Sequence, residues 1–162
     1  MVLLDQALLN ILQPDFEKKH LDLLRVKNID LSGVEQHEGE KTFFWSGKYH
    51  NDLNTRTTLD TQLNVLTKFN PKVPDIFKDA SVVLLGNLDP NIQLEVLDQM
   101  ENKPDLVVLD TMNFWIESYR ERLDELIGRV DVISINDEEA RQLTQKYSLV
   151  EAAKELQTMG PE

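Results

Sequence analysis

Three short and almost continuously apolar runs constrain the fold of this chain more than any other feature. They lie at Val82–Leu85, Leu106–Leu109 and Val130–Ile135, and a helical pattern follows each of them. Strands that are buried on both faces have this composition, because neither face is left to solvent. The alternation of such strands with helices predicts right-handed βαβ crossovers, and therefore an α/β fold with a mostly parallel sheet.

Polar residues follow these runs, namely Asn87, Asp110 and Asn136. In open α/β sheets, ligands bind just beyond the carboxyl ends of the strands. We therefore expect the three side chains to line one edge of the sheet. Asp110 and the nearby Asn113 are suited to binding the hydroxyls of a polyol, although both types also satisfy backbone groups in ordinary turns. The sequence leaves these two interpretations open.

Asn136 and Glu139 lie where the third run passes into a helix. Their amide and carboxylate oxygens suit a hydrated Mg²⁺, which prefers oxygen ligands and keeps several waters. The alternative is simple helix capping, with Asn136 at the N-cap and acidic residues complementing the helix dipole. From spacing alone, capping is the preferred interpretation.

The segment from Thr42 to about Val65 has a different pattern, with β-favouring and turn-forming residues, and it predicts strands and hairpins. Alternation places Phe43, Trp45 and Tyr49 on one face of its first strand. This aromatic face is typical of β packing. It also suits a hairpin that closes over a ligand or pairs with a second subunit.

The secondary structure near the two ends of the chain is predicted less clearly by the sequence. Met1 to Ile11 is apolar enough to be a helix or a buried strand. The next segment, Asp15 to Arg25, predicts a helix with Asp15 as its N-cap. Its expected inner face is Phe16, His20, Leu23 and Leu24. A last helix is expected to open with a capping box at Ser148–Glu151 and to bury Val150, Ala153 and Leu156.

The length of 162 residues allows one domain with a sizeable core. The formal charge of −12 disfavours a nucleic-acid partner. No apolar stretch reaches the length of a membrane span, and the first residues lack a signal-peptide pattern, so a cytoplasmic location is expected. The absence of cysteine excludes disulfides and thiolate metal sites. Neither a Gly-x-x-x-x-Gly-Lys-Ser/Thr loop nor a Gly-x-Gly-x-x-Gly motif occurs, so the chain has no obvious anion cradle.

Several motifs in order resemble the PfkB, or ribokinase-like, family of carbohydrate and nucleoside kinases. Asn136–Leu143 resembles the Asn-x-x-Glu motif of that family. Leu85–Pro90 and Val108–Trp115 precede it in the family's order, and Gly39–Gly47 resembles the lid strands. The resemblance runs from about Asp15 to Glu162.

The resemblance implies a ribokinase-like α/β/α sandwich, which is Rossmann-like, with a β lid at about 39–66 and a βα core at about 71–162. It also implies transfer of the γ-phosphoryl group of ATP, with Mg²⁺, to a hydroxyl of a sugar or nucleoside. In the implied site, Asn136 and Glu139 help to organise Mg²⁺ and phosphate, and Glu139 acts through water. The substrate or phosphate side of the cleft is formed by Asn87, Asp110 and Asn113. The lid residues of the implied site are Phe43, Trp45 and Tyr49.

The chain also departs from the family pattern. The Gly-Gly substrate motif and the Gly-Ala-Gly-Asp motif, which supplies the catalytic base and an anion hole, are both absent. Leu12–Phe16 stands where the family usually has glycine before Asp-Phe. The sequence is therefore expected to be the central portion of a kinase fold, incomplete, and with little or no kinase activity alone.

Two other interpretations remain. The chain is alternatively a non-catalytic derivative that binds a sugar or forms a homodimer through its lid. An unrelated flavodoxin-like binding domain is a third reading, although such domains have no need of the β insertion.

Overall fold

The computed structural model describes residues 1–162 except 6, 13–15, 37–38, 40, 52–55 and 162. Its main sheet has six strands in the order β3-β2-β1-β6-β7-β8. Their bounds are β1 Val2–Leu4, β2 Ala7–Leu12, β3 Val34–Gln36, β6 Val82–Leu85, β7 Leu106–Asp110 and β8 Val132–Ser134. The three apolar runs thus form β6, β7 and β8, which are parallel neighbours as predicted.

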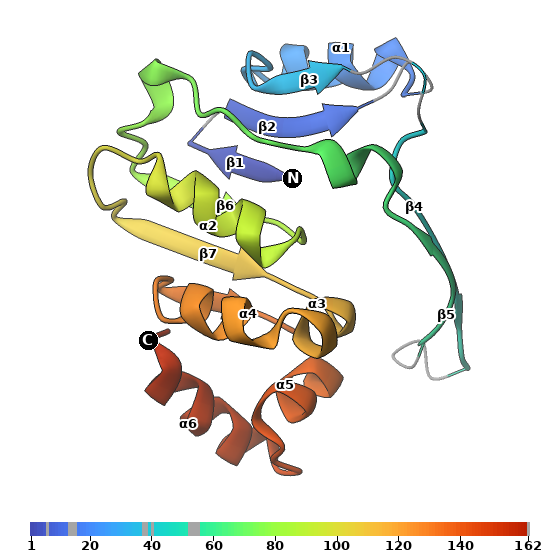
Figure 1. The fold of residues 1–162 in the computed structure, drawn as a ribbon, viewed down its shortest axis with the longest axis vertical. Coiled ribbons are helices and arrows are strands. Elements are labelled where there is room, and N and C mark those ends of the chain that lie inside the picture. The colour runs from blue at the N-terminus through green and yellow to red at the C-terminus, as the bar shows by residue number, and fades with distance from the viewer. Residues whose placement is uncertain (6, 13–15, 37–38, 40, 52–55, 162) are drawn as a thin grey trace.

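One strand runs against the others. β1 pairs antiparallel with both β2 and β6, whereas β2 and β3 are parallel to each other. In Figure 1 the arrowheads of β2, β3 and β7 accordingly point to one side and that of β1 to the other. The undecided segment Met1–Ile11 is therefore two strands, joined at Asp5, whose φ of 47° turns the chain. The Asp5 carboxylate accepts hydrogen bonds from the Ser81 and Val82 N–H groups, which fixes this turn beside β6.

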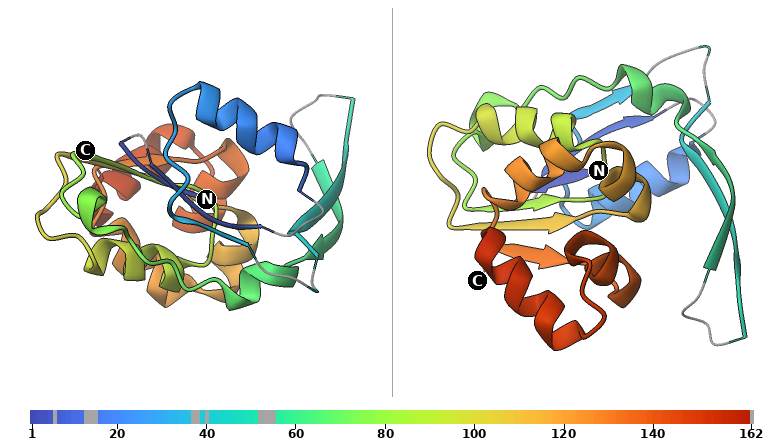
Figure 2. Two further views of the ribbon diagram at one scale, coloured as in Figure 1. Left: turned by 90° about the horizontal axis from the view of Figure 1, so that it is seen from above. Right: turned by 60° about the horizontal axis from the view of Figure 1, so that its bottom comes forward.

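Six α-helices occur in the described part of the chain: α1 Lys18–Val26, α2 Pro90–Asp98, α3 Asn113–Ser118, α4 Arg120–Ile127, α5 Asp137–Thr144 and α6 Leu149–Met159. Short 3₁₀ helices, η1 Asn64–Lys68 and η2 Asp75–Phe77, connect the hairpin to β6. Figure 2 shows α1 on one face of the sheet and α2 with α4 on the other. The sheet therefore has helices on both faces. Strands β1 and β7 are buried or half-buried along their lengths, but the edge strand β8 exposes Val132 and Ser134, so the expected burial of the third apolar run on both faces is wrong.

Helix α2 illustrates how the sequence sets these elements. Asp89 is the N-cap and its carboxylate accepts the Asn91 N–H at 2.8 Å, while Pro90 occupies the first helical position. The face toward the sheet includes Leu94 and Val96 and also a buried polar residue, Gln93.

Three expectations about helices were wrong in detail. Helix α1 has Glu17 at its N-cap and buries Leu21, while Leu23 is 58% exposed, because the helix meets the sheet along a narrower face. The expected cap Asp15 lies outside the described residues. Ser148 is the N-cap of α6 but its side chain makes no capping bond, so the capping box is absent. Helix α6 packs beside α5 and buries Ala152 and Leu156, whereas Val150 is 66% exposed and Ala153 is exposed as well.

The lid segment forms a separate two-stranded sheet of β4 Phe44–Tyr49 and β5 Arg56–Gln62. The pairing shifts between Ser46 and Gly47, since Ser46 pairs with Asp60 and Gly47 with Thr58, which leaves Leu59 as an extra residue. This is a β-bulge. The hairpin stands apart from the main sheet, on the side toward which β2, β3 and β7 point (Figures 1 and 2).

Candidate functional site

A pocket of about 510 Å³ lies between the hairpin and the carboxyl ends of β6 and β7. Its volume falls within the roughly 300–1,000 Å³ common for small-molecule sites. Residues from both parts of the chain line it: Phe43, Trp45, Tyr49, Thr58 and Thr61 from the lid segment, and Asn87, Met112, Asn113, Phe114 and Glu117 from the core. The structure thus brings the three predicted lid aromatics together with two of the three predicted residues of the substrate side.

The hairpin wall depends on two local features. A Cβ placed on Gly47 would lie 2.2 Å from the Trp45 ring. The absence of a side chain at Gly47 therefore leaves room for the indole of Trp45, two positions earlier in β4. The Trp45 indole N–H donates to the Thr58 hydroxyl at 3.3 Å. The bulge at Leu59 changes the alternation of β5, and therefore both Thr58 and Thr61 line the pocket although they are three positions apart.

On the sheet side, Asn87 follows β6 with its amide held in one orientation. The Trp115 indole N–H donates to Asn87 Oδ1 at 2.7 Å. Trp115 is buried on α3 and its ring meets that of Tyr119 edge-on at 5.3 Å. Because the oxygen of Asn87 accepts from Trp115, its NH₂ group is the end available as a donor to a ligand.

Helix α3 contributes the other polar wall. Asn113 and Glu117 are four residues apart, so they share one face of the helix. Gln142 of α5 connects them: Asn113 Nδ2 donates to Gln142 Oε1 at 2.6 Å, and Gln142 Nε2 donates to Glu117 Oε1 at 2.8 Å. This wall of the pocket is therefore tied to α5, the helix that begins with the Asn-x-x-Glu motif.

The ends of β6 and β7 are held together by Gln93, which is fully buried. Its side-chain nitrogen lies 3.4 Å from the Leu85 carbonyl oxygen, 3.0 Å from that of Gly86 and 3.3 Å from that of Asp110. Gln93 Oε1 and the Thr111 hydroxyl are buried without a hydrogen-bond partner among the described residues. Such groups are costly in a packed interior, and they mark this strand edge as unusual.

Asp110 lies at the same edge but does not line the pocket. Its carboxylate acts electrostatically on the Met1 α-amino group, whose pKa is lowered to about 5, mainly by burial. Only Asn113 of the two lines this pocket, and the expectation that Asp110 and Asn113 bind the hydroxyls of a ligand stays a prediction.

Asn136 and Glu139 form a reciprocal capping box at the start of α5. Asn136 Oδ1 accepts the Glu139 N–H at 2.9 Å, and Glu139 Oε2 accepts the Asn136 N–H at 3.0 Å. Next to them, the Arg141 guanidinium donates to the Asp137 carboxylate and holds its pKa below the usual range. The capping interpretation is thus what the structure shows, although an oxygen with one donor still accepts a second from a metal-bound water.

The described residues contain no group of three or more His, Asp or Glu side chains that could hold a metal ion. The indirect role expected for Glu139 toward Mg²⁺, through bound water, stays a prediction. Sequence reasoning missed Thr58, Thr61, Glu117 and Gln142. The spacing of four from Asn113 to Glu117 was the one available signal, and it requires that α3 be recognised first.

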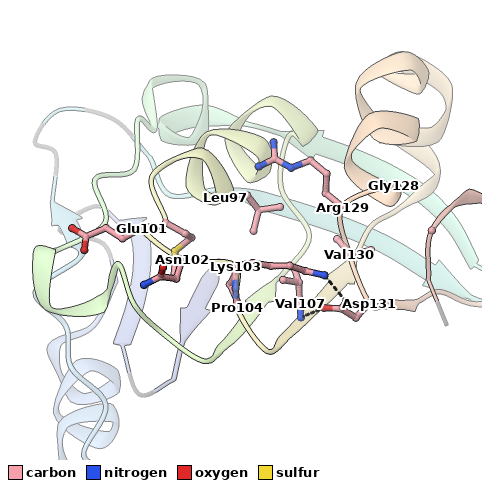
Figure 3. Close-up of a pocket in the computed structure, with 12 residues that line it drawn as sticks. Leu97, Glu101, Asn102, Lys103, Pro104, Val107, Gly128, Arg129, Val130 and Asp131 are labelled. Carbon is pink, nitrogen blue, oxygen red and sulfur yellow. Dashed lines mark hydrogen bonds and ion pairs between the residues drawn. The ribbon is translucent and has the colours of Figure 1, made fainter.

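A second hollow, of about 470 Å³, lies at the opposite end of the strands (Figure 3). The residues before and at the start of β7 and β8 form much of it. The Asp131 carboxylate in this hollow accepts a hydrogen bond from the Val107 N–H at 2.8 Å and lies 3.7 Å from the Lys103 ammonium. Its interactions are local and structural, and we place the candidate site at the carboxyl ends.

The known proteins that this chain resembles are kinases. No family model matches the chain. A cytidine kinase from Thermococcus kodakarensis is 29% identical over 150 residues, which cover 90% of this chain and 52% of that enzyme. A nucleoside kinase from Methanocaldococcus jannaschii, described as an archaeal member of the ribokinase family, superposes with a TM-score of 0.65 at 18% identity, over 92% of this chain and 50% of that one.

The chain has the ribokinase-like fold. A putative ribokinase II from E. coli, solved with ATP and Mg²⁺, gives a TM-score of 0.71 at 12% identity and covers 96% of this chain and 54% of that structure. The nucleoside kinase of Burkholderia thailandensis, in complex with inosine, gives a TM-score of 0.65 at 14% identity. The match covers 91% of this chain and 49% of that structure. The predicted resemblance to PfkB kinases is confirmed, and the flavodoxin-like alternative is not supported.

The chain spans about half the length of the ribokinase-like proteins it matches. Its ribokinase-like fold is accordingly a part of theirs, as the motif pattern predicts. Among the described helices, none is both long enough and apolar enough to cross a membrane.

Proposed function

We propose that this chain forms the acceptor-binding part of a PfkB-type kinase whose acceptor is a nucleoside. The observation that carries the proposal is the pocket between the hairpin and the ends of β6 and β7. It combines aromatic walls with two asparagine amides held by Trp115 and Gln142. Ligand sites generally have this composition of apolar walls with a few placed polar groups.

The aromatic content favours a nucleoside over a free sugar. Phe43, Trp45 and Phe114 offer flat apolar surface that suits the face of a base. A free sugar has mainly hydroxyls to satisfy, whereas a nucleoside brings both a ring to stack and hydroxyls or amino groups to bind. The similarity to a cytidine kinase, and to a nucleoside kinase solved with inosine, supports this choice.

The proposed reaction joins an acceptor hydroxyl oxygen to the γ-phosphorus of ATP. The bond from that phosphorus to the bridging oxygen of ADP breaks, and the hydroxyl proton passes to a base. Bound Mg²⁺ would neutralise charge on the phosphates. Residues of this chain would hold and orient the acceptor, and the hairpin would exclude water from it. Asn136 and Glu139 would accept hydrogen bonds from waters of the Mg²⁺.

The 162-residue chain is expected to bind the acceptor without transferring phosphate. Its sequence has no Gly-Ala-Gly-Asp motif, and a positioned base and anion hole carry much of the rate in such reactions. Incubation with ATP, Mg²⁺ and cytidine should therefore give no nucleotide product above background. Normal ATP-dependent phosphorylation would show that the base lies elsewhere in this chain.

Tryptophan fluorescence tests acceptor binding directly, because the chain's two tryptophans both belong to the site: Trp45 lines the pocket and Trp115 holds Asn87. Titration with cytidine should give a saturable change, while ribose and fructose should bind at least about tenfold more weakly. Equal or tighter binding of a free sugar would instead favour a sugar kinase.

The variant Asn87→Leu should weaken cytidine binding by about tenfold or more, because it removes the donor and leaves the Trp115 N–H unpaired. Gln157→Ala is the matched control, since Gln157 is exposed on α6 and away from the pocket. An equal loss in both variants would mean that the titration does not report this pocket.

We further propose that the hairpin pairs with that of a second copy. Phe44 and Leu59 of the hairpin are 49% and 65% exposed, an apolar pair that a partner strand would cover. Sedimentation analysis should show a dimer that Leu59→Glu converts to a monomer. A monomer in the unmodified chain at high concentration would reject this assembly.

A further inference from the structure

The orientation of the Asn113 amide decides which hydrogen-bonding group one wall of the pocket presents. An asparagine side chain has a donor end and an acceptor end, and they are told apart only by the partners that each one finds. Here Nδ2 of Asn113 lies 2.6 Å from Gln142 Oε1. The end that remains for a ligand is therefore the oxygen, an acceptor.

Gln142 cannot reverse this arrangement without losing a bond. Its own amide nitrogen donates to the Glu117 carboxylate at 2.8 Å, and a carboxylate can only accept. The charge of Glu117 thus fixes the direction of Gln142, and Gln142 in turn fixes that of Asn113. Asn113 thus donates to Gln142, and Gln142 donates to Glu117, and neither amide can turn around without losing a hydrogen bond.

The α3 wall is consequently rich in acceptors. Asn113 Oδ1 and the Glu117 carboxylate both belong to it, and Phe114 lies between them in the sequence. Donors of a ligand fit such a wall, and a carbonyl of a ligand does not. Since Phe114 adds aromatic surface to the same wall, the group that meets these acceptors is best placed on the edge of a stacked base.

We infer that Gln142 is a positioning residue that makes this pocket select bases with an exocyclic amino group, by holding Asn113 with its oxygen toward the ligand. The inference rests on the proposed function, because it assumes that the pocket binds a nucleoside. Beyond that function, the inference specifies which class of base is bound, and it assigns this selectivity to Gln142, a residue outside the pocket wall. Cytidine, with an amino group at C4, fits the acceptor wall, and uridine, with a carbonyl there, does not.

Two substitutions at Gln142 separate this role from simple support of the fold. The variant Gln142→Lys provides only donors, which satisfy Glu117 and turn the Asn113 oxygen away from the pocket. The double variant Gln142→Glu with Glu117→Gln keeps an acceptor for Asn113 Nδ2 and restores a donor at position 117. Both change the charge at position 142, yet only the first is expected to rotate Asn113.

The readout is the ratio of the dissociation constants of cytidine and uridine, measured with the 162-residue chain. The unmodified chain and the double variant should prefer cytidine by about tenfold or more. Gln142→Lys should bring the ratio to about one or favour uridine. Gln142→Ala, which leaves Asn113 free to rotate, should lower the ratio without a change in charge, and it serves if the lysine variant does not fold.

The control is Gln157→Lys, which places the same side chain on exposed helix α6 and should leave the ratio unchanged. The inference is overturned if the unmodified chain binds both nucleosides equally, or if the lysine and alanine variants keep its cytidine preference. Failure of the proposed function looks different, because then the unmodified chain binds neither nucleoside.

Discussion

Gly47 is the residue on which the shape of the lid wall depends most. The Trp45 ring occupies the space that a Cβ at Gly47 would need, and only the far end of that ring is in the way. A larger residue therefore displaces the indole and leaves the strand backbone in place. Such a substitution is therefore expected to weaken ligand binding in the pocket and to leave the stability of the fold almost unchanged.

We predict that Gly47→Ala weakens cytidine binding by about fivefold or more, while the melting temperature changes little. The physical reason is the loss of a flat indole against the base. Trp45 emission should also shift, since its bond to Thr58 is broken. Ser46→Ala, the adjacent position outside the pocket lining, is the control, and a similar loss there would contradict this role of Gly47.

At the scale of elements, strand β1 determines how closely the sheet can pack at the candidate site. The Gly86 N–H donates to the Met1 carbonyl at 2.9 Å, and a Cβ on Gly86 would lie 2.6 Å from the same oxygen. This close approach is between two backbones. Glycine at this position therefore allows β1 to lie against the end of β6, directly before Asn87.

Gly86→Ala should lower the free energy of unfolding by about 1–3 kcal/mol, because neither backbone can move without breaking the sheet pairing. Denaturant unfolding gives the value. Gly128→Ala is the matched control: a Cβ there meets its neighbours at 3.4 Å or more and φ is −66°, so a change within about 0.5 kcal/mol is expected. Equal effects of the two substitutions would contradict the close approach.

The sequence predicts elements where burial leaves a clear pattern. β6, β7 and β8 are evident as short apolar runs, although the edge strand β8 exposes Val132 and Ser134, and Asp89-Pro90 marks the start of α2 by its capping chemistry. The β1–β2 pair is not evident, since a three-residue apolar strand beside a six-residue one resembles a helix in composition. The bulge at Leu59 has no sequence signal, and so the two threonines of the pocket were missed.

The residues of the candidate site likewise divide into those that the sequence predicts and those that only the structure shows. The polar residues after the strands could be named from the sequence, because the carboxyl edge of a parallel sheet is a general binding position. Their partners could not, because Gln142 and Trp115 reach Asn113 and Asn87 through tertiary packing alone. Asn136 and Glu139 had two interpretations in the sequence, and the reciprocal hydrogen bonds of the capping box appear only in three dimensions.

At the scale of the whole molecule, the chain joins a lid hairpin to a ribokinase-like sheet and spans about half of the kinases it matches. Hairpin and sheet come together around one pocket, and the hollow in Figure 3 lies at the other end of the strands. The proposed nucleoside site therefore lies between β4–β5 and the start of α3.

Amide hydrogen exchange, measured with and without saturating cytidine, tests that location most directly. We expect slower exchange in β4, Phe44–Tyr49, and in α3, Asn113–Ser118, with no change around Lys103 and Val107 at the opposite end of the strands. Slower exchange confined to that opposite end, or no slowing anywhere at saturating cytidine, would contradict the proposed location.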